Sequence, residues 1–125
     1  MKLRIKDQSI RFRLSQSEVA QLHRQGSVGG ACRLGLESIG YRLLATSEEA
    51  VRLEYRAGHL TVYLPAAQLD TWAGTDAISM RHHVAMSDGP EVALLVEKDF
   101  QCLTDRPHED ESDLYRHPRA GDLEC

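Results

Sequence analysis

The feature that most constrains this chain is a strict alternation of side-chain type over its first fourteen positions. In the segments KLRIK (residues 2–6) and SIRFRL (residues 9–14), apolar residues alternate with Lys, Arg or Ser. Successive side chains of a strand point to opposite faces, so each segment predicts a strand with one apolar face and one basic face. The short polar link Asp7-Gln8 predicts that the two strands form a hairpin.

Further alternating segments follow along the chain, and they predict strands at 32–38, 40–47, 51–56, 59–65, 77–86 and 91–100. Two segments predict helices instead, at 15–26 and 65–74. Ser15 and Glu18 have the spacing of a capping box, and Gly26 suits the left-handed residue that ends a helix. Residues 27–31, with two glycines, predict a loop, and no internal repeat is apparent.

These elements predict one α+β domain, because hairpin connections dominate and favour a mostly antiparallel sheet. We expect seven to eight strands, which can curl into a partly open barrel, with two short helices. An irregular acidic tail follows, so the expected division is a sheet-plus-helix domain at 1–98 and a tail at 99–125, packed on the same domain.

Composition is typical of a globular protein, with 42% hydrophobic and 27% charged residues among 125. No apolar run has the roughly 18 residues that a membrane span needs, and the first residues do not resemble a signal peptide. The three cysteines are odd in number and form no CxxC pair, which favours a reducing compartment. We therefore expect a cytoplasmic protein without a membrane partner.

Charge is unevenly distributed. Residues 1–63 contain ten Lys/Arg and six Asp/Glu, whereas residues 64–125 contain five Lys/Arg and thirteen Asp/Glu. Such asymmetry indicates either two separate partners or one part of the chain screening the other. One interpretation is that the acidic tail packs over the basic strands, anchored by Phe100 and Leu103.

Two motifs resemble a known family. The opening RIKDQSIRFRLSQSEV (Arg4–Val19) and the closing LVEKDFQCL…EDESD (Leu95–Asp113) are together similar to small bacterial proteins that share a domain of unknown function. The resemblance spans nearly the whole chain, but it implies no activity, cofactor or partner. In that family Asn-Pro follows the acidic cluster, whereas this chain has His117 before Pro118, so no role is carried over to that position.

The C-terminal cluster is a candidate metal site, because thiolate, imidazole and carboxylate groups are the ligands that a divalent transition metal such as Zn accepts. The spacing matches no established zinc or calcium pattern, and an acidic tail without a metal is the alternative. Acids near Cys102 disfavour its thiolate, so it suits a ligand better than a nucleophile. The candidate ligands are Cys102, His108, Glu109, Asp110 and Asp113.

The basic strand face is a second candidate site, for a phosphate, polyphosphate or other anion. Nucleic acid is disfavoured, since the isoelectric point is about 5.8 and exposed aromatic residues are few. The alternative is a solvated strand face on which lysines deter aggregation. The candidate residues are Lys2, Arg4, Lys6, Arg11 and Arg13.

No pattern of a nucleophile with its base is present, so the sequence favours a non-enzymatic role. The favoured function is a small accessory protein that binds a protein partner, with an exposed sheet edge as a route to a homodimer. The alternatives are a metal-binding protein or metal-dependent enzyme around Cys102, and an anion binder.

Overall fold

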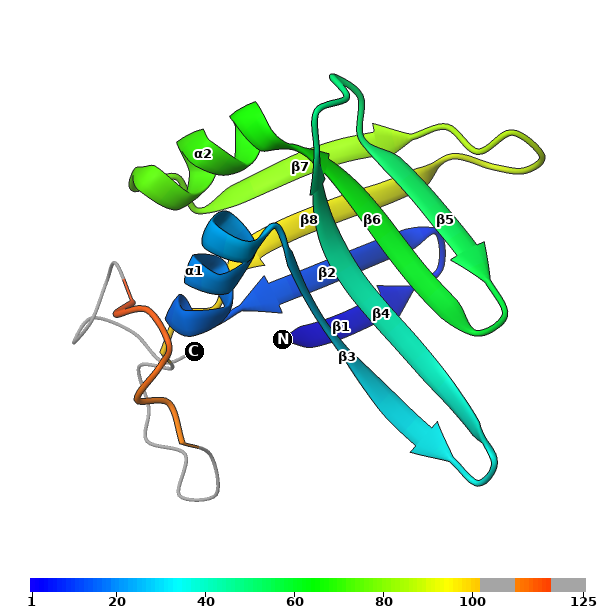
Figure 1. Cartoon of the computed structure of the whole chain (residues 1–125), viewed down its shortest axis with the longest axis horizontal. Coiled ribbons are helices and arrows are strands. Elements are labelled where there is room, and N and C mark those ends of the chain that lie inside the picture. The colour runs from blue at the N-terminus through cyan, green and yellow to red at the C-terminus, as the bar shows by residue number, and fades with distance from the viewer. Residues whose placement is uncertain (102–109, 118–125) are drawn as a thin grey trace.

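The computed structural model describes residues 1–101 and 110–117. It contains two helices and eight strands among these residues (Figure 1). In chain order they are β1 (Lys2–Lys6), β2 (Ser9–Leu14), α1 (Gln16–Gln25), β3 (Ser27–Leu34), β4 (Glu37–Thr46), β5 (Arg52–Arg56), β6 (His59–Pro65), α2 (Ala66–Gly74), β7 (Ser79–Val84) and β8 (Val92–Lys98). The α+β class, the two helices and the strand number predicted from the sequence are confirmed.

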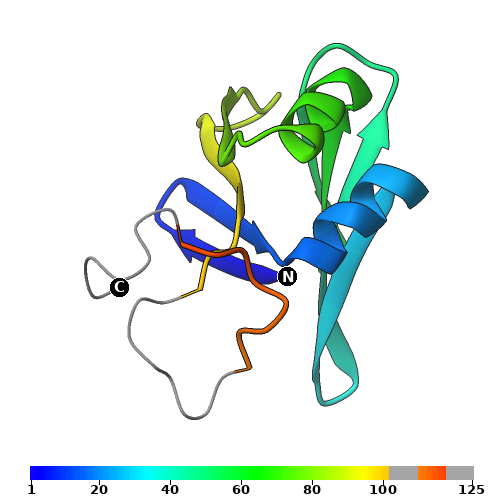
Figure 2. The same cartoon turned by 90° about the vertical axis from the view of Figure 1, so that its left-hand side faces the viewer.

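The strands form two four-stranded sheets rather than one sheet or a closed barrel. Sheet A has the order β1-β2-β8-β7, and sheet B has the order β3-β4-β6-β5. Each hairpin pairs antiparallel, but β2 pairs with β8, and β4 with β6, in parallel. The sheets cross at a large angle, and both helices lie at one end of the space between them (Figures 1 and 2).

The structure reveals an internal repeat that the sequence conceals. The segments β1-β2-α1-β3-β4 and β5-β6-α2-β7-β8 have the same order of elements, and residues 2–22 correspond to residues 52–72. Only two of these 21 paired positions hold identical residues, Leu3/Leu53 and Leu14/Leu64. Each repeat gives one hairpin to sheet A and the other to sheet B, so the repeat is evident in the structure and not in the sequence.

The core lies between the two sheets and under the helices. Equivalent positions of the two repeats fill it: Phe12 with Val62, and Leu22 of α1 with Trp72 of α2. The alternation seen in the sequence explains this, because every second strand residue points inward. The largest fully buried side chains are Trp72, Phe12, Leu14, Leu22, Leu43, Leu64, Leu69, Val62 and Val96.

Strand β3 begins earlier than expected. Residues 27–31, predicted as a loop, form the first half of this strand and pair with β4 from Ser27↔Leu44 onward. Glycine is depleted in strands, which is why the sequence indicated a loop. A side chain at Gly30 would place its Cβ 2.8 Å from the Tyr41 hydroxyl, so glycine makes room for that ring.

Helix α1 begins with the predicted capping box. The Ser15 hydroxyl accepts from the Glu18 amide, and the Glu18 carboxylate accepts from the Ser15 amide at 2.9 Å. Gly26 ends the helix with a φ of 81°, as the sequence predicted. The Met1 ammonium group also pairs with Glu18, which fixes the start of β1 against the helix.

The turn of the β5–β6 hairpin contains a residue with backbone strain that a substitution can relieve. Ala57 has a φ of 51°, a left-handed conformation that costs an L-residue roughly 1–2 kcal/mol. Asparagine tolerates this conformation, and Asn-Gly is favoured in two-residue hairpin loops. We expect Ala57→Asn to raise the free energy of unfolding by up to about 1 kcal/mol in urea titrations.

The matched control is Asp7→Asn, at the equivalent position of the first repeat, where φ is 49°. Aspartate already tolerates this conformation, so the change should stay within about 0.5 kcal/mol. Equal effects at the two sites would contradict the explanation.

Acid should weaken the contacts of Glu18. Burial alone raises its pKa, but hydrogen bonds and charge from the N-terminal ammonium, together with Ser15, outweigh burial and hold the pKa below its ordinary value of 4.5. A lowered folded-state pKa gives stability that is present above the unfolded value and is lost as pH falls through the folded one. We expect Glu18→Gln to lower the free energy of unfolding by about 1 kcal/mol at neutral pH. Urea titrations should show this difference from wild type shrinking below pH 4.5. The exposed Glu49→Gln is the control, and a difference independent of pH would contradict the assignment.

Candidate anion-binding face

The outer face of sheet A, which points away from the core, is basic. Pairing of β1 with β2 sets Lys2 opposite Arg13 and Arg4 opposite Arg11, on one face because side chains alternate. Pairing of β2 with β8 and of β8 with β7 brings Arg81 onto the same face, in one row with Arg11. We call this surface the basic face. Its residues are Lys2, Arg4, Lys6, Arg11, Arg13 and Arg81.

Three of the five residues predicted from the sequence form ion pairs with acids. The Lys2 Nζ atom lies 3.0 Å from Oδ2 of Asp99, whose side chain is 5% exposed. The Arg13 Nε atom donates to Oε1 of Glu97 at 2.7 Å, and Arg11 Nη1 lies 3.7 Å from the same oxygen. Lys2 and Arg13 are therefore held by acids, because β8, the parallel neighbour of β2, brings Glu97 and the following Asp99 beside them. The anion-binding role of the five residues stays a prediction.

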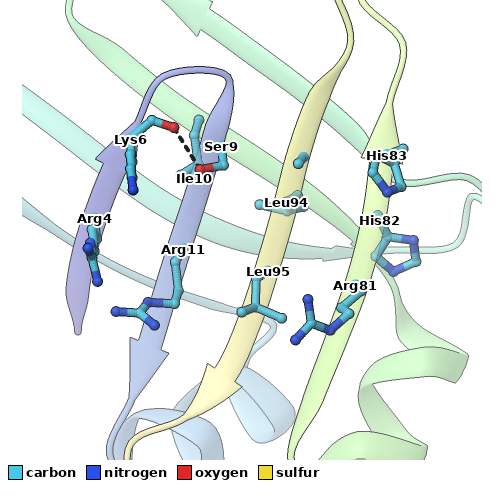
Figure 3. Close-up of a pocket in the computed structure, with 11 residues that line it drawn as sticks. Arg4, Lys6, Ser9, Ile10, Arg11, Arg81, His82, His83, Leu94 and Leu95 are labelled. Atoms are coloured by element: carbon cyan, nitrogen blue, oxygen red, sulfur yellow. Dashed lines mark hydrogen bonds between the residues drawn. The ribbon is translucent and has the colours of Figure 1, made fainter.

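Four cations of the basic face surround a hollow of about 380 Å³ (Figure 3). Arg4 and Lys6 line it from β1, Arg11 from β2 and Arg81 from β7. Leu95 of β8 forms an apolar floor between Arg11 and Arg81, and the Arg81 guanidinium extends toward it. Arg4, Lys6 and Arg81 make no ion pair with an acidic residue of the described part of the chain, so their charge is available to a ligand.

Two histidines also line this hollow. Burial lowers the pKa of His82, so its ring is neutral near pH 7. The His83 Nδ1 atom lies 3.1 Å from Oε1 of Glu91, at the edge of the hollow. The sequence indicated that these neighbours point to opposite faces and do not share a metal ion, and the alternation along β7 agrees.

The internal repeat supplies a natural comparison on sheet B. An equivalent hollow of about 370 Å³ lies there, but Arg11 is replaced by Thr61 and Arg81 by Gly29. A Cβ at Gly40 would lie 2.2 Å from Nδ1 of His59, so glycine lets that ring lie on the sheet. The backbone frame is thus shared by the two sheets, whereas the cluster of cations belongs to sheet A.

The described part of the acidic tail lies on helix α1 rather than on the basic face. The Asp113 carbonyl accepts from the Gln16 amide at 2.9 Å, and its carboxylate accepts from the Ser17 amide at 3.2 Å and from the Ser17 hydroxyl. Phe100 pairs with Tyr115 in an isolated bridge. Asp99 pairs with Lys2 of the basic face, and Leu103, the second predicted anchor, lies outside the described residues.

The predicted metal cluster falls mostly outside the described residues. Cys102, His108 and Glu109 are not among them, so the metal site stays a prediction. Asp113 caps α1, and hydrogen bonds from Ser17 and Ser15 lower the pKa of its carboxyl. Asp110 accepts from the Ser112 amide at 3.0 Å. Within residues 1–101 and 110–117, no three His, Cys, Asp or Glu side chains are placed to hold a metal ion.

Sequence reasoning also missed a buried lysine on the inner side of β8. Lys98 is 6% exposed, and its ammonium group donates to the Thr75 carbonyl at 2.8 Å. Burial lowers its pKa, against the opposing charge of Asp76. The ammonium lies 5.4 Å from the Tyr115 ring centroid and 5.9 Å from that of Trp72. These contacts connect the tail to α2, which accounts for Lys98 as a structural residue.

Fold and site together define a two-sheet α+β domain, built from two interlocked repeats, with a basic hollow on one outer face. By its sequence the chain belongs to the family of unknown function DUF7009, whose sequence model matches residues 1–119. This match confirms the resemblance to a domain of unknown function. No curated protein and no solved structure shows significant similarity to the chain. No helix in the described ranges is long and apolar enough to cross a membrane.

The Glu97 contacts make a prediction about anion binding. Glu97→Gln removes the charge that holds Arg11, which lines the hollow, and its neighbour Arg13, so the positive charge of both becomes available to an anion. A ligand that binds only the folded state stabilises it by mass action. We expect sulfate to raise the melting temperature of Glu97→Gln more than that of wild type, in thermal scans at constant ionic strength. The exposed Glu37→Gln on sheet B is the control, and equal shifts in all three proteins would contradict the role of Glu97.

Proposed function

We propose that this protein binds a multivalent phosphate-bearing anion, such as inorganic polyphosphate, in the basic hollow of sheet A. The observation that carries the proposal is that Arg4, Lys6 and Arg81 line one concave site without an acidic partner among the described residues. Arginine and lysine are the residues that bind phosphate oxygens, and arginine can do so through two parallel hydrogen bonds.

The spacing of the cations favours an extended anion over a single phosphate. Arg4 and Arg81 lie on strands three steps apart in the sheet, and each step is about 4.8 Å, so their backbones are separated by about 14 Å. Arg11 lies between them. Their side chains can therefore contact successive phosphate groups of one chain.

The local charge differs from that of the whole molecule. The chain has a net charge of −4, so a polyanion is repelled by most of its surface and attracted at this one face. The hollow has no Phe, Tyr or Trp side chain on which a base can stack, and its apolar floor is aliphatic. This composition supports a phosphate chain rather than a single-stranded nucleic acid, which aromatic platforms usually bind.

The proposal develops the anion-binding alternative of the sequence analysis. It does not replace the expectation of an accessory role, because a polyanion-binding protein without catalysis is itself an accessory protein. The expectations of a cytoplasmic location, a bacterial origin and a protein partner stay proposals. The metal site around Cys102 also stays one, and it depends on residues outside the described ranges.

The test measures binding of defined-length polyphosphate and of orthophosphate to wild type, Arg4→Gln and Arg81→Gln by isothermal titration calorimetry. We expect polyphosphate to bind more tightly than orthophosphate, and each variant to weaken it by about tenfold. Each lost phosphate contact should also reduce the slope of log K against log salt by about 1.

The matched control is Arg56→Gln, the equivalent of Lys6 on sheet B, because it removes the same charge far from the hollow. It should leave affinity and salt slope unchanged. If Arg56→Gln and Arg81→Gln weakened polyphosphate binding equally, the binding would depend on the net charge of the protein and not on the hollow, and the proposal would be wrong. Absence of polyphosphate binding to wild type would also overturn it.

A further inference from the structure

A further hollow, of about 210 Å³, lies between the two sheets and is lined mainly by residues of β1, β4, β5 and the loop after β7. In Figure 1 the helices lie on the left, and the β1–β2, β5–β6 and β7–β8 turns lie on the right. We call it the apolar mouth. Its principal lining residues are Leu3, Ile5, Ile39, Leu53, Tyr55 and Met86.

The exposed apolar surface of the described residues is concentrated at this end. At the rim of the mouth Ile5 is 63%, Tyr55 67% and Ile39 46% exposed. At the tip of the adjacent β3–β4 hairpin Leu34 is 57% and Leu36 100% exposed. Of the large hydrophobic residues exposed in the described ranges, Ile78 alone lies elsewhere. Clustered apolar exposure of this kind marks interaction surfaces.

The internal repeat shows what is missing from the mouth. The β7–β8 ladder ends at Val84↔Val92, and the loop that follows returns Met86 to the mouth, where it packs against the core. The β3–β4 ladder instead continues to Leu34↔Glu37, so this hairpin runs straight into solvent. Leu34 occupies the position equivalent to Met86. Met86 of the second repeat thus packs into the mouth, whereas Leu34 of the first repeat points into solvent and leaves the equivalent part of the mouth open.

We propose that the chain forms a two-fold dimer in which the Leu34–Leu36 hairpin tip of each copy enters the apolar mouth of the other. The occupant is a hairpin side chain of the same aliphatic kind as Met86, which already contacts this site from within the molecule. Tip and mouth belong to one chain, and Ile39 is on both the hairpin and the rim. Reciprocal insertion therefore closes the assembly at two copies.

A second copy suits the mouth better than a small ligand. Small-molecule pockets combine apolar walls with a few convergent polar groups that orient the ligand. The charged residue at this mouth, Glu54, lies 3.7 Å from Arg52 Nη1 and is engaged there. The mouth is therefore suited to packing and offers little to position a polar head group.

The first test is sedimentation equilibrium of the full chain over a range of concentrations. We expect the mass of a dimer for wild type, and a dissociation constant at least about tenfold higher for Leu36→Asp, which places a charge in an apolar contact. Leu36 is fully exposed, so its replacement leaves the monomer fold intact, as circular dichroism can verify. The control is Ser87→Asp, which adds the same charge to the exposed loop of the equivalent β7–β8 hairpin and should not change the dissociation constant.

The second test combines two charge variants. Leu36→Glu and Tyr55→Lys should each weaken self-association, whereas their equimolar mixture should recover it. In the mixed dimer one tip and mouth carry opposite charges, and the other pair is unaltered. A wild-type monomer at all concentrations, open-ended association, or failure of the mixture to recover the dimer would overturn the proposal. A monomer that binds a fatty acid, with binding lost in Tyr55→Lys, would assign the mouth to a small apolar ligand instead.

Discussion

The parallel pairing of β2 with β8 and of β4 with β6 is the constraint on which the rest of the structure depends. Each pairing joins a hairpin of the first repeat to a hairpin of the second, and the β2–β8 pairing does so across a long separation in the chain. Because each repeat contributes to both sheets, neither half can bury its apolar strand faces alone. The core therefore forms only when the two halves interlock, and this arrangement determines both the basic face and the apolar mouth.

The same pairing determines the charge of the basic face. It sets Arg13 beside Glu97 and brings β7, with Arg81, into the row of Arg4 and Arg11. Some cations are thereby neutralised while others converge on a hollow. On sheet B the equivalent frame has glycines and a threonine at these places. The repeated backbone arrangement thus gives two similar faces, and differences in side chains make them chemically distinct.

The two ends of the molecule also differ for a physical reason. The helices follow β2 and β6 directly, so both cover the same end of the space between the sheets. The opposite end is covered only by hairpin turns, and the straight β3–β4 hairpin leaves it partly open. The described tail closes the helical end further, since Asp113 caps α1 and Tyr115 packs against Lys98. Contacts with other molecules are therefore expected at the open end and on the outer faces.

Local patterns in the sequence were sufficient for much of the fold. Alternation gave the hairpins and their faces, and the Ser15–Glu18 spacing gave the cap of α1. These features depend on neighbouring residues, so they can be read without the fold. The strand predicted at 32–38 missed the first residues of β3 (Ser27–Leu34) and ran through the turn before β4. The glycines of β3 serve contacts with Tyr41 and Arg42 on the next strand, which no local pattern reveals.

What the sequence by itself determined is the set of elements, the basic character of β1 and β2, and family membership. Only the tertiary structure decided that the strands form two sheets, that the chain repeats, and that Arg81 joins the basic face while Lys2 and Arg13 are neutralised. The physical reason is that secondary structure follows from side-chain periodicity over a few residues. Sheet order and charge pairing follow instead from contacts between distant segments, such as Arg13 with Glu97, which only the packed core brings together.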